Sequence, residues 1–384
     1  MKRITEDWIT KQATQDVCTA LTDGGAQAFF VGGCVRNALL QAPVSDIDIA
    51  TDSKPDRVME LAQAAGLKPI PTGIDHGTVT VVSKGIPHEV TTFRRDVETD
   101  GRRAVVAFSD KVEEDAARRD FTMNALYARP DGTIIDPLNG LHDLQARRVR
   151  FIGEANDRIR EDYLRSLRYF RFHAWYGDAN AGFDADALSA IATNLDGLET
   201  LSRERVGAEM LKLLAAPDPA PSVAIMGSTG VLARLLPGAD DRALAILTKL
   251  EQDAHAVPEA IRRLAAIASP EVAKPLRLSR AQLQRLTRMR EEAMATTSVA
   301  ELGYRYGSEG GLHETLLRCA FHEQPWTQGL SQALEQGAAA SFPIKAVDLI
   351  PAFSGPALGA KLAELEARWI ASDFALSRAE LLAE

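Results

Sequence analysis

Residues 28–50, AFFVGGCVRNALLQAPVSDIDIA, decide the fold of the first part of the chain. Ala28 to Val31 predicts a short buried strand, which a Gly-Gly turn joins to a helical segment. Asp46 to Ala50 predicts a second strand, on which Asp46 and Asp48 project from one face because they lie two residues apart. The pattern indicates a compact unit of strands and helices.

This stretch also carries a candidate chemistry. Two adjacent glycines, Gly32 and Gly33, allow the backbone to approach a phosphate chain, and Arg36 is placed to bind a phosphate. Two carboxylates on one face are how proteins hold Mg²⁺ together with substrate phosphates. Alone, a Gly-Gly is usually a turn and an Asp-x-Asp is usually a solvated strand edge. Together, at this spacing, they favour nucleotidyl transfer.

Sequence patterns that predict strands occur only in the first ~140 residues. From Leu141 onward the chain is a series of Ala/Leu/Arg/Glu-rich amphipathic stretches, so the remainder should be essentially all helical. Further strands are expected at Gly77–Val82, His88–Phe93 and Thr133–Asp136, helices at Ile9–Leu21, Val35–Leu40, Asp157–Trp175, Ser202–Ala215, Asp241–Gln252 and Ser279–Ala293, and breaks at Pro217–Pro221, Pro237-Gly238 and Gly303–Gly311.

Composition excludes several classes of protein. The chain has 384 residues, 46% hydrophobic residues and no apolar run near the ~20 residues of a membrane span. Its net charge of −9 argues against non-specific coating of nucleic acid. The N-terminus is charged and amphipathic, and Cys18, Cys34 and Cys319 form no disulfide or zinc pattern. We expect a cytoplasmic protein of two to four domains, without a membrane and without an evident obligate protein partner.

Two more clusters carry polar groups that suit a nucleotide. In Glu113 to Leu126, Arg119 and Asp120 form a donor and acceptor pair suited to a ribose or a phosphate, although an exposed salt-bridged helix has the same pattern. In Arg160 to Phe172, an Asp and an Arg at helical spacing can read the edge of a base. A surface helix with ion pairs is the alternative for this segment also. On the predicted helix, Asp162, Arg165, Tyr169 and Phe172 share one stripe, with Arg168 and Arg171 beside it.

These blocks in order resemble a known family. GGCVRN with SDIDIA, then RRDFTMNALYARPDGTIIDPLNGLHDL (residues 118–144), then EDYLRSLRYFRF (residues 161–172), are similar to the class II tRNA nucleotidyltransferases, the CCA-adding enzymes of the DNA polymerase β superfamily. The poly(A) polymerases of that family share the first two blocks. The resemblance covers residues 28–175 densely and resumes weakly at residues 348–370.

The resemblance implies a fold and a set of domains. The fold class is α+β, with a small mixed-sheet nucleotidyltransferase head followed by an all-helical neck, body and tail. We place the head at residues 1–140, the neck, which recognises the base, at 141–215, the body at 216–300 and the tail, which binds tRNA, at 301–384.

The resemblance also implies roles for individual residues. Asp46 and Asp48 resemble the catalytic metal carboxylates, and Arg94 to Phe108 is similar to the flexible loop associated with the switch from CTP to ATP. The nucleotide-binding residues are Gly32, Gly33 and Arg36 for the triphosphate, Arg119 and Asp120 for the ribose, Asp162 and Arg165 as the amino-acid template for the base, and Arg168 and Arg171 as phosphate or template-supporting contacts.

A few residues depart from the pattern or are open to two interpretations. The family usually has Asp where this chain has Asn37, a position that we interpret as structural. Glu89 is either a third carboxylate near the metals or a strand-surface residue. His142 and Asp143 look like a metal pair, but the companion histidines are missing.

The implied function is addition of C, C and A to the 3′ end of tRNA from CTP and ATP, with Mg²⁺ as cofactor and release of pyrophosphate. An A-adding enzyme or a poly(A) polymerase of the same family is the alternative. A non-catalytic RNA-binding protein on this scaffold is the alternative of another class.

One basic stretch suggests how an acidic chain would hold tRNA. Residues 262–290 contain eight basic residues and one acid. A stripe of them along predicted helices would follow the phosphates, whereas intramolecular ion pairs are the competing interpretation. The candidate tRNA-binding residues are Arg277, Arg280, Arg285 and Arg288.

Overall fold

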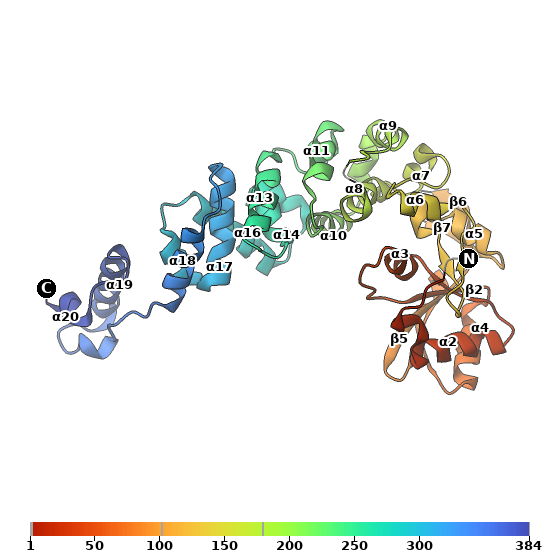
Figure 1. Cartoon of the computed structure of the whole chain (residues 1–384), viewed down its shortest axis with the longest axis horizontal. Coiled ribbons are helices and arrows are strands. Elements are labelled where there is room, and N and C mark those ends of the chain that lie inside the picture. Colours follow the sequence, from red (N-terminus) through yellow and green to blue (C-terminus); the bar gives the residue numbers. More distant parts are fainter. Residues whose placement is uncertain (1–2, 101–102, 179, 384) are drawn as a thin grey trace. The chain divides into compact units, whose positions relative to one another are not determined.

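The computed structural model describes residues 3–100, 103–178 and 180–383. The chain divides into two compact units, residues 1–213 with 221–235 and residues 214–220 with 236–384. All named strands belong to the first unit, and the described part of the second is helical (Figure 1). The finer division into head, neck, body and tail stays a prediction.

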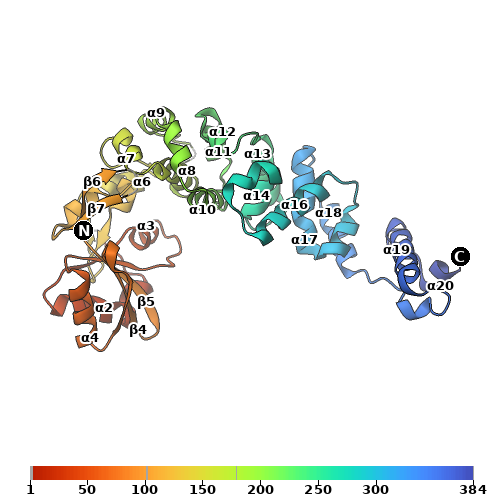
Figure 2. The ribbon, with the colours of Figure 1, turned by 180° about the vertical axis from the view of Figure 1, so that it is seen from behind.

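The first unit is built on a seven-stranded mixed sheet in the order β3-β4-β5-β2-β1-β8-β9. β2 and β5 run parallel, and the other neighbouring strands are antiparallel. Helices α2 and α4 pack against each other and against β4, as the views in Figures 1 and 2 agree. The strands are β1 (Ala28–Val31), β2 (Asp48–Thr51), β3 (Lys68–Gly73), β4 (Thr78–Ser83), β5 (Ile86–Thr92), β6 (Arg94–Asp100), β7 (Arg103–Phe108), β8 (Tyr127–Ala128) and β9 (Ile134–Ile135).

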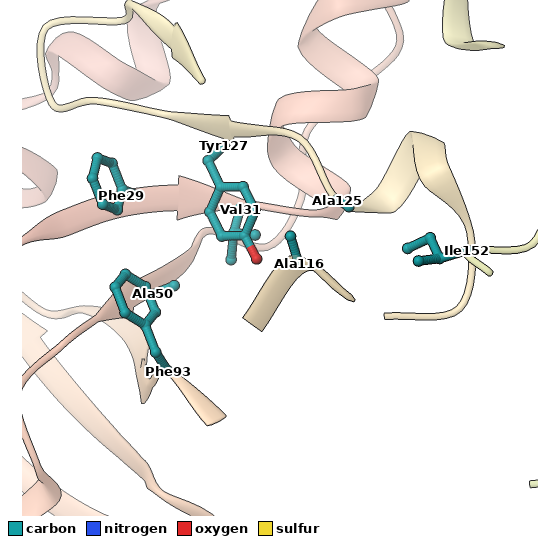
Figure 3. Close-up of a cluster of buried hydrophobic side chains, with 8 residues drawn as sticks. All are labelled: Phe29, Val31, Ala50, Phe93, Ala116, Ala125, Tyr127 and Ile152. Carbon is teal, nitrogen blue, oxygen red and sulfur yellow. The ribbon is translucent and has the colours of Figure 1, made fainter. Parts of the chain in front are cut away.

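A buried apolar cluster fixes the segment that precedes Arg118 to Asp120. Phe29 on β1 stacks on Phe93 with ring centroids 6.1 Å apart and meets the edge of Tyr127 on β8. Ala116 of α5 lies in the same cluster (Figure 3), so the end of α5 is held against the strands. The buried members are Phe29, Val31, Ala50, Phe93, Ala116, Ala125, Tyr127 and Ile152.

The predicted strands are confirmed with small shifts, except that Asp46 lies outside β2. The sequence did not indicate β3, β8 or the ribbon of β6 and β7. β3 is an edge strand with two prolines and mostly exposed residues, so it lacks the alternation that identifies a half-buried strand.

The segment expected to be a flexible loop, Arg94 to Phe108, forms the antiparallel ribbon β6–β7. Gly101 and Arg102, which lie between the two strands in sequence, are outside the described residues. The ribbon carries its own two-stranded sheet, separate from the large one. Its role in the switch from CTP to ATP stays a prediction.

Helices account for the rest of the described chain, as predicted, and none of them is long and apolar enough to span a membrane. The predicted helix Asp157–Trp175 is in fact two, α7 and α8, separated at Asp162 and Tyr163. The helices are α1 (Asp7–Thr10), α2 (Gln12–Asp23), α3 (Gly33–Leu39), α4 (Pro55–Ala64), α5 (Val112–Ala117), α6 (Gly140–Gln145), α7 (Ala155–Glu161), α8 (Leu164–Tyr176), α9 (Ala185–Thr193), α10 (Arg203–Leu214), α11 (Ala220–Ser228), α12 (Val231–Leu235), α13 (Arg242–Asp253), α14 (Ala260–Ile267), α15 (Pro270–Ala273), α16 (Arg280–Met294), α17 (Val299–Phe321), α18 (Gln328–Ala339), α19 (Gly355–Ala371) and α20 (Arg378–Leu382); the 3₁₀ turns are η1 (Ile74–His76), η2 (Thr122–Asn124), η3 (Leu195–Thr200), η4 (Lys274–Leu276) and η5 (Ala346–Asp348).

Glycines shape the second unit at two places. α17 is kinked at Gly307, whose φ of 74° is left-handed, within the joint predicted at Gly303–Gly311. α17 and α18 then pack so closely that a Cβ on Gly337 would lie 1.7 Å from the carbonyl oxygen of Ala300. A side chain there would push the helices apart. Gly359 on α19, by contrast, has no neighbouring atom within 4 Å of such a Cβ.

Candidate active site

A cavity of about 410 Å³ in the first unit gathers most of the predicted site residues. It opens between the start of α3, the start of β2, the segment after α5, and the helices α8 and α10. Its lining residues are Gly32, Gly33, Arg36, Asp48, Arg118, Arg119, Asp120, Asn124, Asp162, Leu164, Arg165, Arg168, Phe172 and Arg205.

The glycine turn brings the backbone to the cavity wall. Gly32 has a φ of 71°, a left-handed conformation that favours glycine, and it caps α3 directly after β1. A Cβ at Gly32 would lie 3.4 Å from Nη1 of Arg119. A larger residue would therefore strain the turn and crowd that arginine.

Arg36 is almost fully buried, with 7% of its surface exposed, and lines the cavity through its guanidinium. Its Nη1 donates to Oδ1 of Asn124, and Nη2 donates to Oδ1 of Asn37 at 3.0 Å and to the hydroxyl of Tyr176 at 2.8 Å. The ring of Phe172 also lies below the guanidinium, 5.1 Å from Cζ. Burial lowers the pKa of Arg36 from its ordinary value.

Asp48 is the predicted metal carboxylate that reaches the cavity. It is the first residue of β2 and lies beside Glu89 of β5 in the parallel register. Burial and then the charges of Glu89 and Asp46 raise the pKa of Asp48 above its ordinary value. The charges of Glu89 and Asp46 thus repel that of Asp48, whereas the charge of Arg119 attracts it.

Asp46 differs from the prediction, because it precedes the strand instead of lying on it. It is exposed, accepts a hydrogen bond from Ser45 at 3.0 Å and does not line the cavity. The described residues contain no ready-made group of three metal-binding side chains. The donor set nevertheless suits a divalent cation, which would relieve the repulsion around Asp48 and complete its coordination with substrate phosphates and water.

Arg119 and Asp120 both reach the cavity, but each has its own partner. Arg119 donates to Oδ2 of Asp115 at 2.9 Å and to the hydroxyl of Tyr127 at 3.1 Å. Burial raises the pKa of Asp115, but the charges of Arg119 and Arg118 outweigh it and lower the pKa to about 2. Asp115 therefore holds Arg119 in place as a carboxylate over the whole physiological range of pH.

Asp120 is the centre of a second network. It accepts hydrogen bonds from the backbone N–H of Phe121 and from Nδ2 of Asn124, both at 2.9 Å, and from Nε of Arg168 at 2.7 Å. Asn124 in turn accepts from Arg36. A continuous chain of polar contacts therefore joins Arg168 to Arg36 across the cavity.

Asp162 and Arg165 meet at the cavity, although not as one helical stripe. Asp162 has an extended backbone, with φ −153° and ψ 104°, in the break between α7 and α8. Its Oδ1 accepts from the N–H of Leu164 at 3.1 Å, and its Oδ2 accepts from Nη2 of Arg205 at 2.6 Å. Arg165, in the first turn of α8, pairs with Glu161. Both side chains are thereby oriented before a ligand arrives.

The other members of the expected stripe separate. Phe172 and Arg168 line the cavity, whereas Tyr169 is fully buried in an aromatic cluster with Phe121. Arg171 does not line the cavity, and its guanidinium pairs with Glu209 at 2.7 Å. Of the expected stripe, Asp162, Arg165 and Phe172 therefore line the cavity, and Tyr169 belongs to the core.

Sequence reasoning missed four lining residues, Arg118, Asn124, Leu164 and Arg205. Asn124 lies four residues after Asp120, within a block that the sequence singled out for its neighbours. Arg205 is 43 residues from Asp162 in sequence, and no local pattern connects them. Only the tertiary fold brings its guanidinium to the cavity.

The basic stretch in the second unit is mostly paired. Arg262 and Arg263, both 1% exposed, are buried on Glu251, so the stripe expected over residues 262–290 is wrong at these two positions. Arg288 pairs with the buried Glu314 at 3.0 Å, and Arg285 lies 3.4 Å from Glu259. The exposed candidates for tRNA contact are Arg277, Arg280 and Arg285.

Comparisons with known proteins agree on one family. The family described as "Poly A polymerase head domain" matches residues 28–150, and "Probable RNA and SrmB- binding site of polymerase A" matches residues 182–242. The chain is 43% identical over 229 residues to the CCA-adding enzyme of Geobacillus thermodenitrificans (strain NG80-2), a match that covers 59% of this chain and 55% of the relative. It thus spans about half the length of several curated relatives that it matches.

Two solved structures share the fold over nearly the whole chain. The Bacillus stearothermophilus CCA-adding enzyme in complex with CTP is 30% identical, with a TM-score of 0.72, and the match covers 94% of this chain and 93% of that one. The Thermotoga maritima CCA-adding enzyme complexed with tRNA is 18% identical, with a TM-score of 0.71, over 99% of this chain and 95% of that one, and shows the fold alone.

A longer sequence match decides the family. The mitochondrial CCA tRNA nucleotidyltransferase 1 of Mus musculus is 32% identical over 368 residues, which are 91% of this chain and 84% of the relative. With the head-domain match and the site residues gathered in one cavity, this identity over most of both chains shows that the chain belongs to the tRNA nucleotidyltransferase family of CCA-adding enzymes.

Proposed function

We propose that the chain adds C, C and A to the 3′ end of tRNA, using CTP and ATP and releasing pyrophosphate. The observation that carries the proposal is that Asp48, Arg36 and the Asp162–Arg165 pair line one cavity. Groups for the reacting phosphate and groups for the base thus lie within reach of one nucleotide. The printed names of the relatives and the CTP complex of the B. stearothermophilus enzyme support the same activity.

The reaction is an in-line displacement at the α-phosphorus of the nucleotide. The 3′-hydroxyl oxygen of tRNA forms a bond to the α-phosphorus and loses its proton, while the bond from that phosphorus to the bridging oxygen breaks and pyrophosphate leaves. No covalent enzyme intermediate is needed, so positioning and charge stabilisation supply the catalysis. Arg36 would bind the triphosphate, and the turn at Gly32 and Gly33 lets it approach the backbone.

Membership in the family implies a divalent metal ion, and we propose Mg²⁺. Asp46 and Asp48 would hold it, and Glu89 lies in register with Asp48 as an additional carboxylate. The ion would lower the pKa of the attacking hydroxyl and neutralise the leaving pyrophosphate.

Base choice would rest on Asp162 and Arg165. A carboxylate accepts from the exocyclic amine that cytosine and adenine share, and a guanidinium donates to a ring acceptor. Guanine and uracil present a carbonyl oxygen at the amine position and would face the carboxylate of Asp162. The ion pairs with Arg205 and Glu161 fix the two side chains for this task.

The ribose would be bound beside Arg119 and Asp120. Asp115 and Tyr127 fix Arg119, and Arg168 and Asn124 fix Asp120. We propose that Arg168 supports this wall of the cavity, and that Arg171 supports it indirectly, because Arg171 contacts the ring of the cavity residue Phe172 at 4.7 Å.

The test is the length of the product made from tRNA transcripts that end before CCA, with CTP alone, ATP alone or both. A CCA-adding enzyme extends by CC with CTP alone and completes CCA with both. An A-adding enzyme would extend only transcripts that already end in CC. A poly(A) polymerase would add a run of A to any transcript, and a non-catalytic RNA-binding protein would extend none.

We also propose a cytoplasmic location, although two relatives, from Mus musculus and Homo sapiens, are named as mitochondrial enzymes. All three cysteines are buried and free, which suits a reducing compartment. Cell fractionation with antibodies to the chain tests this directly.

A further inference from the structure

Arg36 differs from its neighbours in having only neutral partners. Its three hydrogen-bonding side chains are the amides of Asn37 and Asn124 and the hydroxyl of Tyr176. The rings of Phe172 and Tyr176 cover it, with the Tyr176 centroid 4.1 Å from Cζ. No carboxylate is among these groups.

The other arginines that line the cavity each pair with a carboxylate. Among the residues that the structure describes, Arg36 is the cavity arginine without such an ion pair. The pairs are Arg118 and Arg119 with Asp115, Arg165 with Glu161, Arg168 with Asp120 and Arg205 with Asp162.

A buried guanidinium without a counter-charge is costly for the empty protein. Burial is the largest influence on Arg36 and lowers its pKa, and the attraction of Asp120 is shared with Arg168. An anion that enters the cavity supplies the missing negative charge, and its interaction with Arg36 is strong because little water screens it. The unpaired charge therefore favours a polyphosphate.

Asn37 is the residue that offers Arg36 a neutral acceptor in place of a carboxylate. Its Nδ2 donates to the carbonyl oxygen of Pro43 at 2.8 Å, which turns Oδ1 toward Nε and Nη2 of Arg36 at 3.2 and 3.0 Å. An Asp has the same shape but would place a full negative charge there. It would also lose the hydrogen bond to Pro43, in the segment that leads to Asp46.

We propose that Asn37 is a positioning residue that holds Arg36 with a neutral acceptor, and that by leaving the charge of Arg36 uncancelled it preserves the affinity of the cavity for the phosphate chain of the nucleotide. The inference rests on the proposed function only in taking this cavity as the nucleotide site. It assigns to Asn37 an electrostatic role in place of the structural one expected from sequence.

The decisive variant is Asn37→Asp, which changes charge and little else. Calorimetric titration of the full chain with tripolyphosphate, CTP and cytidine separates the phosphate contribution from the base contribution. We expect affinity for tripolyphosphate and CTP to fall about ten-fold, the scale of one charge-assisted hydrogen bond, and affinity for cytidine to stay unchanged. The loss should shrink as salt rises, since screening weakens the interaction.

Two further variants separate charge from geometry. Asn37→Ala removes the acceptor but adds no charge, so its melting temperature should fall while tripolyphosphate affinity stays within about three-fold of wild type. Gln63→Glu places the same charge on the exposed side of α4, outside the cavity, and should leave tripolyphosphate binding unchanged.

The inference is overturned if Asn37→Asp binds tripolyphosphate as tightly as the wild type, or if Asn37→Ala loses as much affinity as Asn37→Asp. Equal loss of cytidine binding in Asn37→Asp would also overturn it, because that result marks a general distortion of the cavity. If the wild type binds CTP but makes no CCA product, the proposed function fails while this inference stands. If the wild type binds neither tripolyphosphate nor CTP, both fail.

Discussion

The two ends of the cavity treat charge differently. At the end with Asp48 and Arg36, neither group forms an ion pair with another described residue, although Arg119 attracts Asp48 and Asp120 attracts Arg36. At the end with Asp162 and Arg165, each charge is paired. Unpaired charge is costly when buried and is relieved by an ion, whereas paired charge is fixed in orientation. The end with Asp48 and Arg36 is therefore suited to binding a metal ion and phosphates. The end with Asp162 and Arg165 is suited to recognising a base.

The largest loss of activity should follow a substitution at the end of the cavity that contains Asp48 and Arg36. Asp48→Asn removes the carboxylate that reaches the cavity, so incorporation of both CMP and AMP should fall by at least about 10²–10³-fold, the scale of losing one stabiliser of transition-state charge. Filter binding should find tRNA affinity nearly unchanged. Asp52→Asn, directly after the same strand and outside the cavity, is the matched control, because Asn keeps an acceptor for the backbone N–H of Gln27. Substantial activity of Asp48→Asn with Mg²⁺ would contradict the proposal that Asp48 holds the metal ion.

Substitutions at the end of the cavity that contains Asp162 and Arg165 should change the selectivity between bases more than the rate of nucleotide addition. In Asp162→Ala and in Arg165→Ala, discrimination against UTP and GTP should relax by about 10- to 100-fold, because one good bidentate base contact is worth ~1–3 kcal/mol. Competition between labelled nucleotides measures this directly. Asp157→Ala, on the exposed side of α7, should leave selectivity intact. Unchanged selectivity in both cavity variants would leave these residues as structural ion pairs.

Arg205 sharpens the comparison, because it lines the cavity and binds Asp162, through which it would influence the choice of base. Arg205→Ala should relax base selectivity by about three- to ten-fold, less than loss of Asp162 itself, since Oδ1 of Asp162 keeps its bond to Leu164. Arg205→Lys should recover part of the selectivity. Arg203→Ala on the same helix is the control. An Arg205→Ala variant with lower rate but unaltered base choice would contradict the positioning role.

In the second unit, Arg280 and Arg285 are exposed, the latter beside Glu259, whereas Arg288 pairs with a buried carboxylate. Arg280→Glu with Arg285→Glu should weaken tRNA binding and flatten its salt dependence by about 0.7–0.9 per lost phosphate contact, while CTP affinity stays the same. Arg288 is excluded from this variant because its reversal would strand the buried Glu314. If the double variant keeps wild-type tRNA affinity, another surface must bind tRNA, and the predicted tail at residues 301–384 is the first candidate.

Most of the residues that line the cavity could be predicted from sequence to lie together, because they occur in short blocks. Gly32, Arg36 and Asp48 are separated by turns and one short helix, so local spacing was enough to group them, whereas their role in binding a nucleotide stays a prediction. Asp162 was assigned to a helix, since its neighbours have helical spacing and a two-residue break leaves no mark in the pattern. Arg205 could not be found, because its position depends on how α10 packs.

In the basic stretch at residues 262–290, the sequence predicted exposed residues at two positions that the structure buries. Arg262 and Arg263 look like a surface stripe in sequence, but the backbone carbonyls of Leu214 and Pro217 and the carboxylate of Glu251 accept their hydrogen bonds in the interior. Composition counts charges and cannot tell whether a carboxylate from another helix will meet them. The edge strand β3 was missed for a related reason, since exposure on both faces removes the alternation of apolar residues.

The helical glycines of the second unit set limits on how the chain can be made more heat-resistant. Replacing a helical glycine by alanine usually stabilises by about 0.4–1 kcal/mol, because the unfolded chain loses freedom. Gly337→Ala should instead destabilise, since its Cβ would collide with the Ala300 carbonyl, whereas Gly359→Ala should raise the melting temperature. Scanning calorimetry of the two variants should give opposite shifts. Thermal adaptation of this fold therefore has room along α19 and almost none where α17 crosses α18.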